Sequence, residues 1–276
     1  MSEKTAHNGS HGETDESGFA DIHCHILPGL DDGAENAEIS FAMAQLAIEA
    51  GTRDLAATPH ANYTFHYDPA RNASLRGELQ ARIDSELSGG LRLHIGCDFH
   101  LTYENIQDAI ANYGKYSLDG GRYLLVEFPE VFAPDGMEQA LLQLLDANYV
   151  PVLTHPERNP TFQIHADLLA RYVKLGCVAQ ITGSSYLGGF GRQAQRAAEE
   201  YLKRELVHVI ASDGHGIRGR RPILSEAAGR IVSLSGEAVA QALSRDNPLA
   251  ILHNQPSLPY YPSPETHKKK KFFAWR

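Results

Sequence analysis

The chain has 276 residues, of which 42% are hydrophobic and 21% charged, and its formal net charge is −9. This length and composition predict one globular domain whose core is large enough to fold without disulfides. The acidic balance argues against a nucleic-acid-binding protein, because such domains usually present a basic face. A local positive pocket for an anionic substrate stays compatible with the charge, since local fields need not follow the net charge.

The three cysteines are widely spaced and form no CxxC pair: Cys24, Cys97 and Cys177. A disulfide scaffold or zinc ribbon is therefore not expected, and a reducing cytoplasm is the expected compartment. Neither a membrane-spanning apolar run nor a signal peptide is predicted. Residues 1–18 read as a disordered tail and 255–276 as a Pro-rich, basic tail. Its KKKKFFAWR end fits either a solvated tail or contact with an acidic membrane or partner.

Between the tails, short β-rich runs alternate with helical patterns. The helices are expected at 34–51, 69–87, 137–148, 166–176, 192–206, 225–236 and 236–248. The strands are expected at 19–27, 54–60, 91–99, 123–128, 150–155, 178–183 and 206–213. Such alternation predicts right-handed βαβ units and a parallel sheet. Seven repeats within residues 19–254 favour a single α/β barrel over an open sheet.

Six of the seven predicted strands end in a histidine or an acidic residue, and the 178–183 strand is the exception. The residues at these ends are His23, His25, His60, Asp98, Glu127, His155, Asp213 and His215. Active sites of such barrels form at the carboxyl ends of the strands. Each residue alone fits a buried histidine or a capping Asp. Together they favour a metal site, because unpaired buried charges would cost several kcal/mol each.

The first strand shows how these side chains are directed. His23 and His25 point to one face and Cys24 to the other, because side chains alternate along a strand. Asp21 shares the histidine face and is expected to accept a ring N–H from a ligand histidine. With Asp32 there are nine candidate ligands, which implies two or three ions. The mixed nitrogen and oxygen donors favour manganese, iron or zinc.

The motifs DIHCHILPGLDDGA, ATPH, PVLTHPER and LVHVIASDGHG together resemble the polymerase-and-histidinol-phosphatase (PHP) superfamily. Within it, residues 19–254 look like the bacterial capsule and exopolysaccharide tyrosine phosphatases. The resemblance implies a distorted (β/α)7 barrel that holds two or three ions, commonly manganese. It also implies hydrolysis of phosphotyrosine by a metal-activated hydroxide. The implied substrate is the phosphotyrosine-bearing tail of a bacterial tyrosine kinase.

The resemblance also distributes the ligands. It implies that the first ion is held by His23, His25 and Asp213, the second by Asp32, His60 and His215, and the third by Glu127 and His155. Asp98 would bridge ions, although the family commonly has a glutamate there, one methylene longer. His100, on the same face, is a candidate to compensate.

Two arginines match family positions implicated in binding the substrate phosphate, Arg158 and Arg220, although Arg218 and Arg221 are neighbours of the latter. A guanidinium binds phosphate oxygens in a bidentate way and stays charged. The proton for the leaving group is left to His60, His215 or water. Two alternatives stay open: a phosphatase for a small phosphomonoester such as histidinol phosphate, and a non-catalytic kinase-binding module.

Overall fold

The structure, a computed structural model, describes residues 18–130 and 134–262. The strands are β1 (Phe19–Cys24), β2 (Thr52–Ala57), β3 (His60–Ala61), β4 (Arg92–Ile95), β5 (Asp98–His100), β6 (Tyr123–Glu127), β7 (Val150–Thr154), β8 (Val178–Thr182) and β9 (Val209–Ala211). The helices are α1 (Ala37–Glu49), α2 (Pro69–Glu86), α3 (Tyr103–Ala111), α4 (Pro134–Asp146), α5 (Pro160–Ile164), α6 (Ala166–Lys174), α7 (Gly191–Lys203), α8 (Ser225–Ser235), α9 (Glu237–Gln241) and α10 (Asn247–Leu252).

All strand pairs are parallel and fall into a three-stranded sheet, β1-β2-β4, and a six-stranded sheet, β3-β5-β6-β7-β8-β9. The expected strands at 54–60 and 91–99 are each interrupted, so β2 with β3 and β4 with β5 form two broken barrel strands. Pairing continues across the breaks through Gly96 N to Ala57 O and Asp98 N to Pro59 O. Gly96, between β4 and β5, lies close to Leu118, because a Cβ there would be 2.6 Å from the Leu118 side chain.

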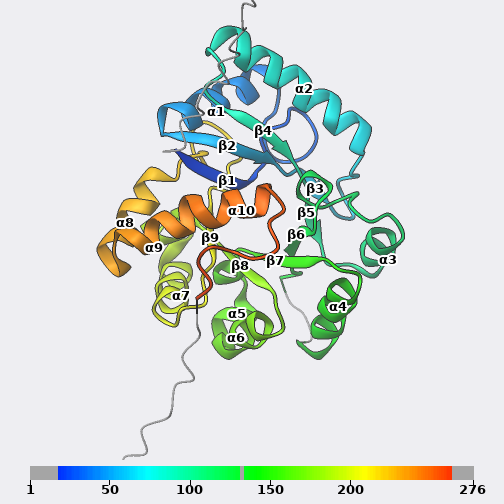
Figure 1. Ribbon diagram of the computed structural model, residues 1–276, viewed down its shortest axis with the longest axis vertical. Coiled ribbons are helices and arrows are strands. Elements are labelled where there is room, and N and C mark those ends of the chain that lie inside the picture. Colours follow the sequence, from blue (N-terminus) through cyan, green and yellow to red (C-terminus); the bar gives the residue numbers. More distant parts are fainter. Residues whose placement is uncertain (1–17, 131–133, 263–276) are drawn as a thin grey trace, which may run out of the picture.

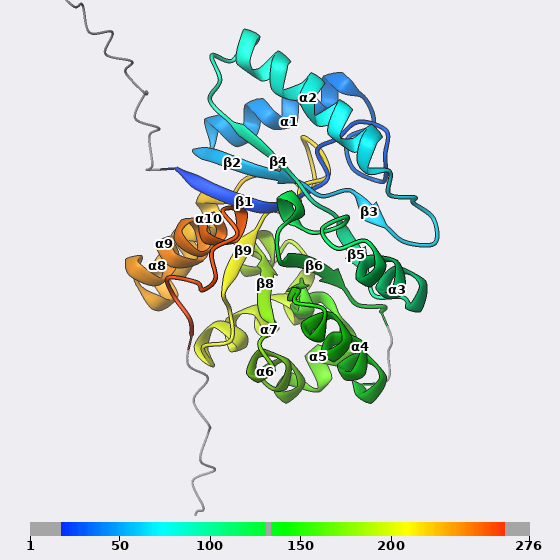
Figure 2. The ribbon, with the colours of Figure 1, turned by 45° about the vertical axis from the view of Figure 1, so that its right-hand side comes forward.

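The barrel closes between β1 and β9. His25 N donates to Gly214 O and Asp213 N donates to His23 O, both at 2.8 Å. Seven strand positions therefore form a closed, distorted barrel, as predicted. The helices surround it, with α1 and α2 over the three-stranded sheet and α4 to α7 over the larger one (Figures 1 and 2).

The helices begin where the sequence supplies caps. Asn36 accepts hydrogen bonds from two backbone N–H groups at the start of α1, and Asp68 does the same for α2, which has Pro69 in its first turn. Such caps stabilise a helix because the first N–H groups have no partner within it. No helix among the described residues is both long and apolar enough to cross a membrane.

The amino-terminal end of the barrel is filled by α10 and the chain that follows it. Ile251 and Leu252 pack with the barrel-strand side chains of Ile22 and Val209 in one buried cluster. Residues 255–262, the first part of the segment expected as a tail, lie against the barrel. Tyr260 exchanges two hydrogen bonds with the Asn247 side chain. This closure leaves the opposite, carboxyl end of the barrel for polar groups.

A buried ion network at β4 makes stability depend on pH. His94 lies 2.5 Å from Asp119 Oδ2 and 3.0 Å from Asp54 Oδ1. Burial opposes the charged imidazole, but the two carboxylates outweigh it and raise the pKa of His94 to about 9. A raised folded-state pKa stabilises the protein below the unfolded value of 6.5, and this contribution is lost as the pH rises through 9.

We therefore expect His94→Gln to lower the free energy of unfolding by about 2 kcal/mol at acidic pH. The difference in unfolding free energy between the variant and the wild type should shrink as the pH rises above the pKa of His94. Urea denaturation at several pH values measures it, with His253→Gln, an exposed histidine, as control. A deficit that is constant with pH would contradict this assignment.

Candidate metal centre

The nine side chains expected as ligands gather at the carboxyl end of the barrel. They fall into four overlapping groups, in each of which one donor atom per residue lies within 4.8 Å of the others. The groups are His25–Asp32–His60–His215, His23–His25–Asp213, His23–Asp98–His155 and His60–Asp98–Glu127. Asp98 is shared by two groups, as are His23, His25 and His60, so the cluster has the connectivity of a multi-ion site.

Two neighbours fix the ring nitrogens that face the cluster. His23 Nδ1 lies 3.0 Å from Gln180 Oε1, and His25 Nδ1 lies 2.7 Å from Asp31 Oδ2. Both neighbours are acceptors, so each Nδ1 carries a hydrogen and each Nε2 is the nitrogen left to bind a proton or a metal ion. The two Nε2 atoms are only 3.2 Å apart. Two nitrogens that converge in this way suit a cation between them.

The expectation that Asp21 accepts a ring N–H is wrong. Its Oδ1 accepts the backbone N–H of His23 at 3.3 Å and that of Ser212 at 3.0 Å. Asp21 lies one step below the histidines, where its short side chain reaches the main chain of β1 and of the segment after β9. The ring N–H groups are instead accepted by Asp31 and Gln180, neither of which was predicted. The sequence offered a signal for each: Asp31 is a second acidic residue beside Asp32, and Gln180 is a polar residue inside an apolar strand.

Several polar atoms directed into the cluster have no hydrogen-bond partner among the described residues, although they are buried. They are His60 Nδ1, Asp98 Oδ2, Asp213 Oδ1 and His215 Nε2. Each belongs to one of the four groups. Buried polar atoms without partners are costly, and shared cations would satisfy all four. The residues therefore fit divalent metal ions on their geometry alone.

Asp98 reaches the centre of the cluster despite its shorter side chain. Its Oδ2 lies 3.4 Å from both His23 Nε2 and His60 Nδ1. Thr154 Oγ1, at 3.4 Å, donates to its other oxygen. His100 is not in any of the four groups, and its Nδ1 lies 3.5 Å from Glu127 Oε2. It stands beside a candidate ligand rather than in place of one.

The acidic and imidazole groups strongly perturb one another. Burial disfavours the charged form of His23, but Asp98 and Asp213 outweigh it and raise the pKa of His23 to about 9. Burial likewise opposes ionisation of Asp213, yet His23, His25 and Arg220 hold the pKa of its carboxyl well below its usual range. The site is therefore built around ionised carboxylates that hold positive charge, either protons or metal ions.

Two of the candidate ligands occupy the left-handed backbone region. His155 has φ of 33° and Asp213 has φ of 51°. For residues other than glycine this conformation costs on the order of 1–3 kcal/mol, and it concentrates at functional sites. It turns both side chains sharply from the ends of their strands into the cluster. Sequence patterns give no sign of this strain.

The two predicted arginines lie side by side at the cluster. Arg158 Nη1 and Arg220 Nη2 both donate to Asp213 Oδ2. Their guanidinium carbons lie 4.2 and 5.7 Å from the ring centroid of Phe190, so one aromatic ring supports both cations. Phe190, just before α7, was not foreseen. Neither Arg218 nor Arg221 contacts Asp213 in this way.

Glu157 anchors the loop that carries His155 and Arg158. Its carboxylate is fully buried and accepts hydrogen bonds from Ser185 Oγ at 2.7 Å and Thr182 N at 3.1 Å. It therefore ties the end of β7 to the end of β8. Burial raises its pKa to about 7.

The cysteines have no place in the chemistry of this site. All three are buried and free. The Cys24 thiol is turned from the histidines toward Gly214 O, at 3.5 Å, and burial raises its pKa well above the ordinary thiol value. A thiolate nucleophile needs a lowered pKa and access, and none of the three offers both.

Comparison with known proteins shows the family of this chain. Residues 19–253 match the model of the family described as capsular polysaccharide synthesis, CpsB/CapC. The chain belongs to this family. It is 33% identical to the tyrosine-protein phosphatase YwqE of Bacillus subtilis, over 92% of this chain and 99% of the relative. It is 32% identical to the putative tyrosine-protein phosphatase CapC of Staphylococcus aureus, over 75% and 81%.

Solved structures agree with the CpsB/CapC fold. The chain superposes on a crystal structure from work on YwqE and on CpsB of Streptococcus pneumoniae, described as unique metal-dependent tyrosine phosphatases. The TM-score is 0.81 at 32% identity, over 89% of this chain and 99% of that one. A phosphotriesterase homology protein from Escherichia coli matches with a TM-score of 0.58 at 11% identity. This weaker likeness shows the shared barrel fold alone.

Proposed function

We propose that this CpsB/CapC protein is a metal-dependent phosphatase that hydrolyses phosphotyrosine in proteins. The observation that carries the proposal is the pair of imidazole nitrogens, His23 Nε2 and His25 Nε2, held 3.2 Å apart beside two arginines. Metal ions and arginines together suit a phosphate ester, because both act on the oxygens of the phosphoryl group. The names of the YwqE and CpsB relatives support phosphotyrosine as the ester.

The nine clustered residues would hold two or three divalent ions. One group would be His23, His25 and Asp213, and a second Asp32, His60 and His215, with His25 also near. Glu127 and His155 would hold the third, with Asp98 between the groups. Bound ions would supply an activated water and neutralise phosphate charge. We propose manganese, with iron or zinc as the alternatives, because the donors are nitrogen and oxygen.

Arg158 and Arg220 would bind the substrate phosphate. Both now donate to the same oxygen of Asp213, so donor groups are already aimed at the cluster. Each planar guanidinium has five N–H groups and can donate to phosphate oxygens while keeping its Asp213 contact. The Phe190 ring lies against the guanidinium groups of both arginines. The arginines would thereby orient the ester and stabilise the charge that develops on its oxygens.

The leaving phenolate would depart on the side formed by Asp32, His60 and His215. Asp32 is the most exposed of the nine residues, with 53% of its side chain accessible, and its Oδ1 lies 3.4 Å from Nε2 of each histidine. The tyrosine phenol has a pKa near 10, so its phenolate needs only modest protonation to leave. Water on this solvent-facing side would supply that proton, because His60 and His215 would be occupied as ligands of the second ion.

The proposed physiological substrate is the phosphotyrosine-bearing tail of a bacterial tyrosine kinase, and the proposed compartment is the cytoplasm. The capsular polysaccharide description of the family supports a role in controlling capsule or exopolysaccharide synthesis. The phosphatase domain would span residues 19–254, which contain all the candidate ligands, and residues 255–262 pack against it.

Removal of metal tests the proposal. We expect a phosphotyrosine peptide to be hydrolysed by the loaded enzyme, activity to vanish after dialysis against a chelator, and added manganese to restore it. Elemental analysis should show two or three ions per chain. Iodoacetamide serves as the control and should leave the rate unchanged, since the cysteines are buried.

Three results would contradict the proposal. Full turnover after exhaustive stripping would exclude metal catalysis. Faster hydrolysis of histidinol phosphate than of the peptide would favour a small-molecule phosphatase. An enzyme loaded with metal that hydrolyses neither would favour a kinase-binding module.

A further inference from the structure

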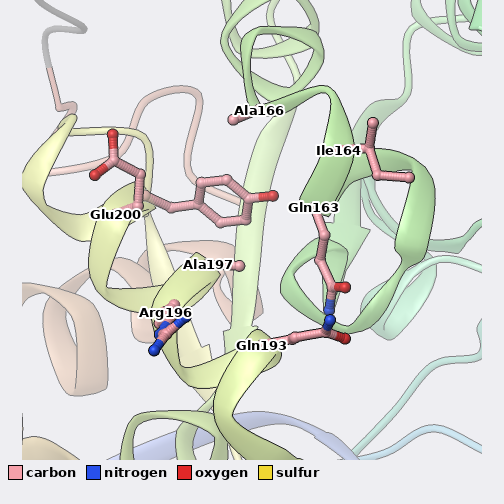
Figure 3. Close-up of a pocket in the computed structure, with 8 residues that line it drawn as sticks. Gln163, Ile164, Ala166, Gln193, Arg196, Ala197 and Glu200 are labelled. Atoms are coloured by element: carbon pink, nitrogen blue, oxygen red, sulfur yellow. The ribbon is translucent and has the colours of Figure 1, made fainter.

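A groove lies between α7 and the α5–α6 segment, outside the metal cluster. It encloses about 330 Å³. Gln193, Arg196 and Glu200 line it from α7, and they share one face because they are three and four residues apart. Gln163 and Ile164, the latter 75% exposed, form the opposite wall. In Figure 3, Gln163 and Gln193 approach each other at one end of the groove and Glu200 lies at the other.

One end of the groove adjoins the proposed phosphate site. Gln163 Nε2 donates to the backbone oxygen of Glu157 at 2.7 Å, immediately before Arg158. On the other wall, Gln193 follows Phe190 by three residues, which is about 4.5 Å of helical rise. The Phe190 ring in turn contacts Arg158. A chain that leaves the arginines would therefore enter the groove at its two glutamines.

The end of the groove near the site is positive. Neither Arg192 nor Arg196 makes an ion pair within residues 18–130 and 134–262. They lie in the first two turns of α7, whose amino-terminal end adds partial positive charge. The nearby Glu199 pairs with Arg230, and Glu200, at the far end of the groove, makes no ion pair with the residues that the structure describes. This local charge contrasts with the net charge of −9.

The groove has room for a short extended peptide. Gln193 and Glu200 are seven residues apart on α7, or about 10 Å along the helix. An extended chain advances about 3.3 Å per residue, so about three residues fit. Ala166, Ala197 and Tyr201 line the groove between its polar ends. Its apolar stretch can accept the aliphatic part of acidic side chains, and their carboxylates can reach Arg196.

We propose that this groove binds an acidic stretch of about three residues that flanks the phosphotyrosine of the protein substrate. The inference rests on the proposed phosphotyrosine phosphatase function and adds to it a preference for sequence. Arg196 contacts the acidic side chains directly. Arg192 does not line the groove, and its positive charge adds to the electrostatic attraction. Protein substrates would thus be distinguished from small phosphate esters by residues that lie outside the metal cluster.

The test compares kcat/KM for three phosphotyrosine peptides: three glutamates before the phosphotyrosine, three after it, or alanines on both sides. We expect the wild-type enzyme to prefer at least one acidic peptide over the alanine peptide by about fivefold, the effect of roughly 1 kcal/mol of charge pairing. Arg196→Glu should abolish or reverse that preference, mainly through KM. Lys174→Glu, an equal charge change on the exposed end of α6, should retain it.

The outcomes separate the two proposals. A wild-type enzyme that hydrolyses p-nitrophenyl phosphate and all three peptides equally overturns the groove assignment but leaves the phosphatase intact. Equal loss of preference in Arg196→Glu and Lys174→Glu also overturns it, because only bulk charge would then matter. Failure of the metal-loaded wild-type enzyme on p-nitrophenyl phosphate and on every peptide would instead reject the phosphatase function itself.

Discussion

Replacing Asp213 by asparagine is expected to lower kcat on a phosphotyrosine peptide by about 10²- to 10⁴-fold, which corresponds to the roughly 3–5 kcal/mol lost when one partner leaves a buried charge cluster. The side chain keeps its size but loses its charge. Asp213 lies within 3.5 Å of His23 and His25 and accepts hydrogen bonds from Arg158 and Arg220. It thus joins the candidate metal ligands to the proposed phosphate site.

Steady-state kinetics and elemental analysis of the same preparations measure this effect. Metal content should fall by at least one ion per chain, and thermal unfolding should show that the variant is folded. Asp167→Asn is the matched control, because Asp167 is 97% exposed and pairs only with Arg204. Wild-type kcat with a full complement of metal in the Asp213 variant would contradict the central place given to this carboxylate.

Replacing Arg158 or Arg220 by lysine is expected to lower kcat/KM by about 100-fold each, since the loss of one aligned donor from such a site costs about 2.7–4 kcal/mol. Lysine keeps the charge but not the planar, bidentate guanidinium. It also loses the flat face that contacts Phe190. The two arginines share one acceptor, Asp213 Oδ2, so their effects should not add.

The measurement that distinguishes this role from a structural one is metal content, which should stay at the wild-type level in both lysine variants. Arg171→Lys, which alters the pair between the exposed Arg171 and the partly buried Glu138 on α4, provides the control and should keep wild-type kinetics. Lysine variants with unchanged kcat/KM would show that the phosphate is bound elsewhere.

The barrel could be predicted from the sequence because each strand and most helices carry strong local patterns. The predicted strand at 54–60 is broken near Pro59, which has no N–H to donate, and the one at 91–99 is broken near Gly96. Helix α3 was missed although its sequence carries helix signals. Thr102 caps its start, and Ile106 and Ala109 lie on its buried side.

The positions of the nine candidate ligands were within reach of the sequence, because the carboxyl ends of parallel strands meet at one end of a barrel. The orientation of those ligands could not be predicted from the sequence. Asp31, Gln180 and Phe190 act through contacts between segments far apart in the chain, and no periodicity records such contacts. The Asp21 prediction failed for the same reason, since its partner atoms belong to the backbones of β1 and the segment after β9.

The sequence by itself therefore determined the kind of fold and the chemical types gathered in the site, because hydrophobic alternation and the residues at strand ends are local properties. Tertiary structure alone decided which ring nitrogen of His23 and His25 faces the cluster, that Arg158 and Arg220 converge on one oxygen, and that a groove lined by Arg196 lies beside them. Each of these depends on distances between side chains from different strands and helices, and those distances exist only once the barrel has closed.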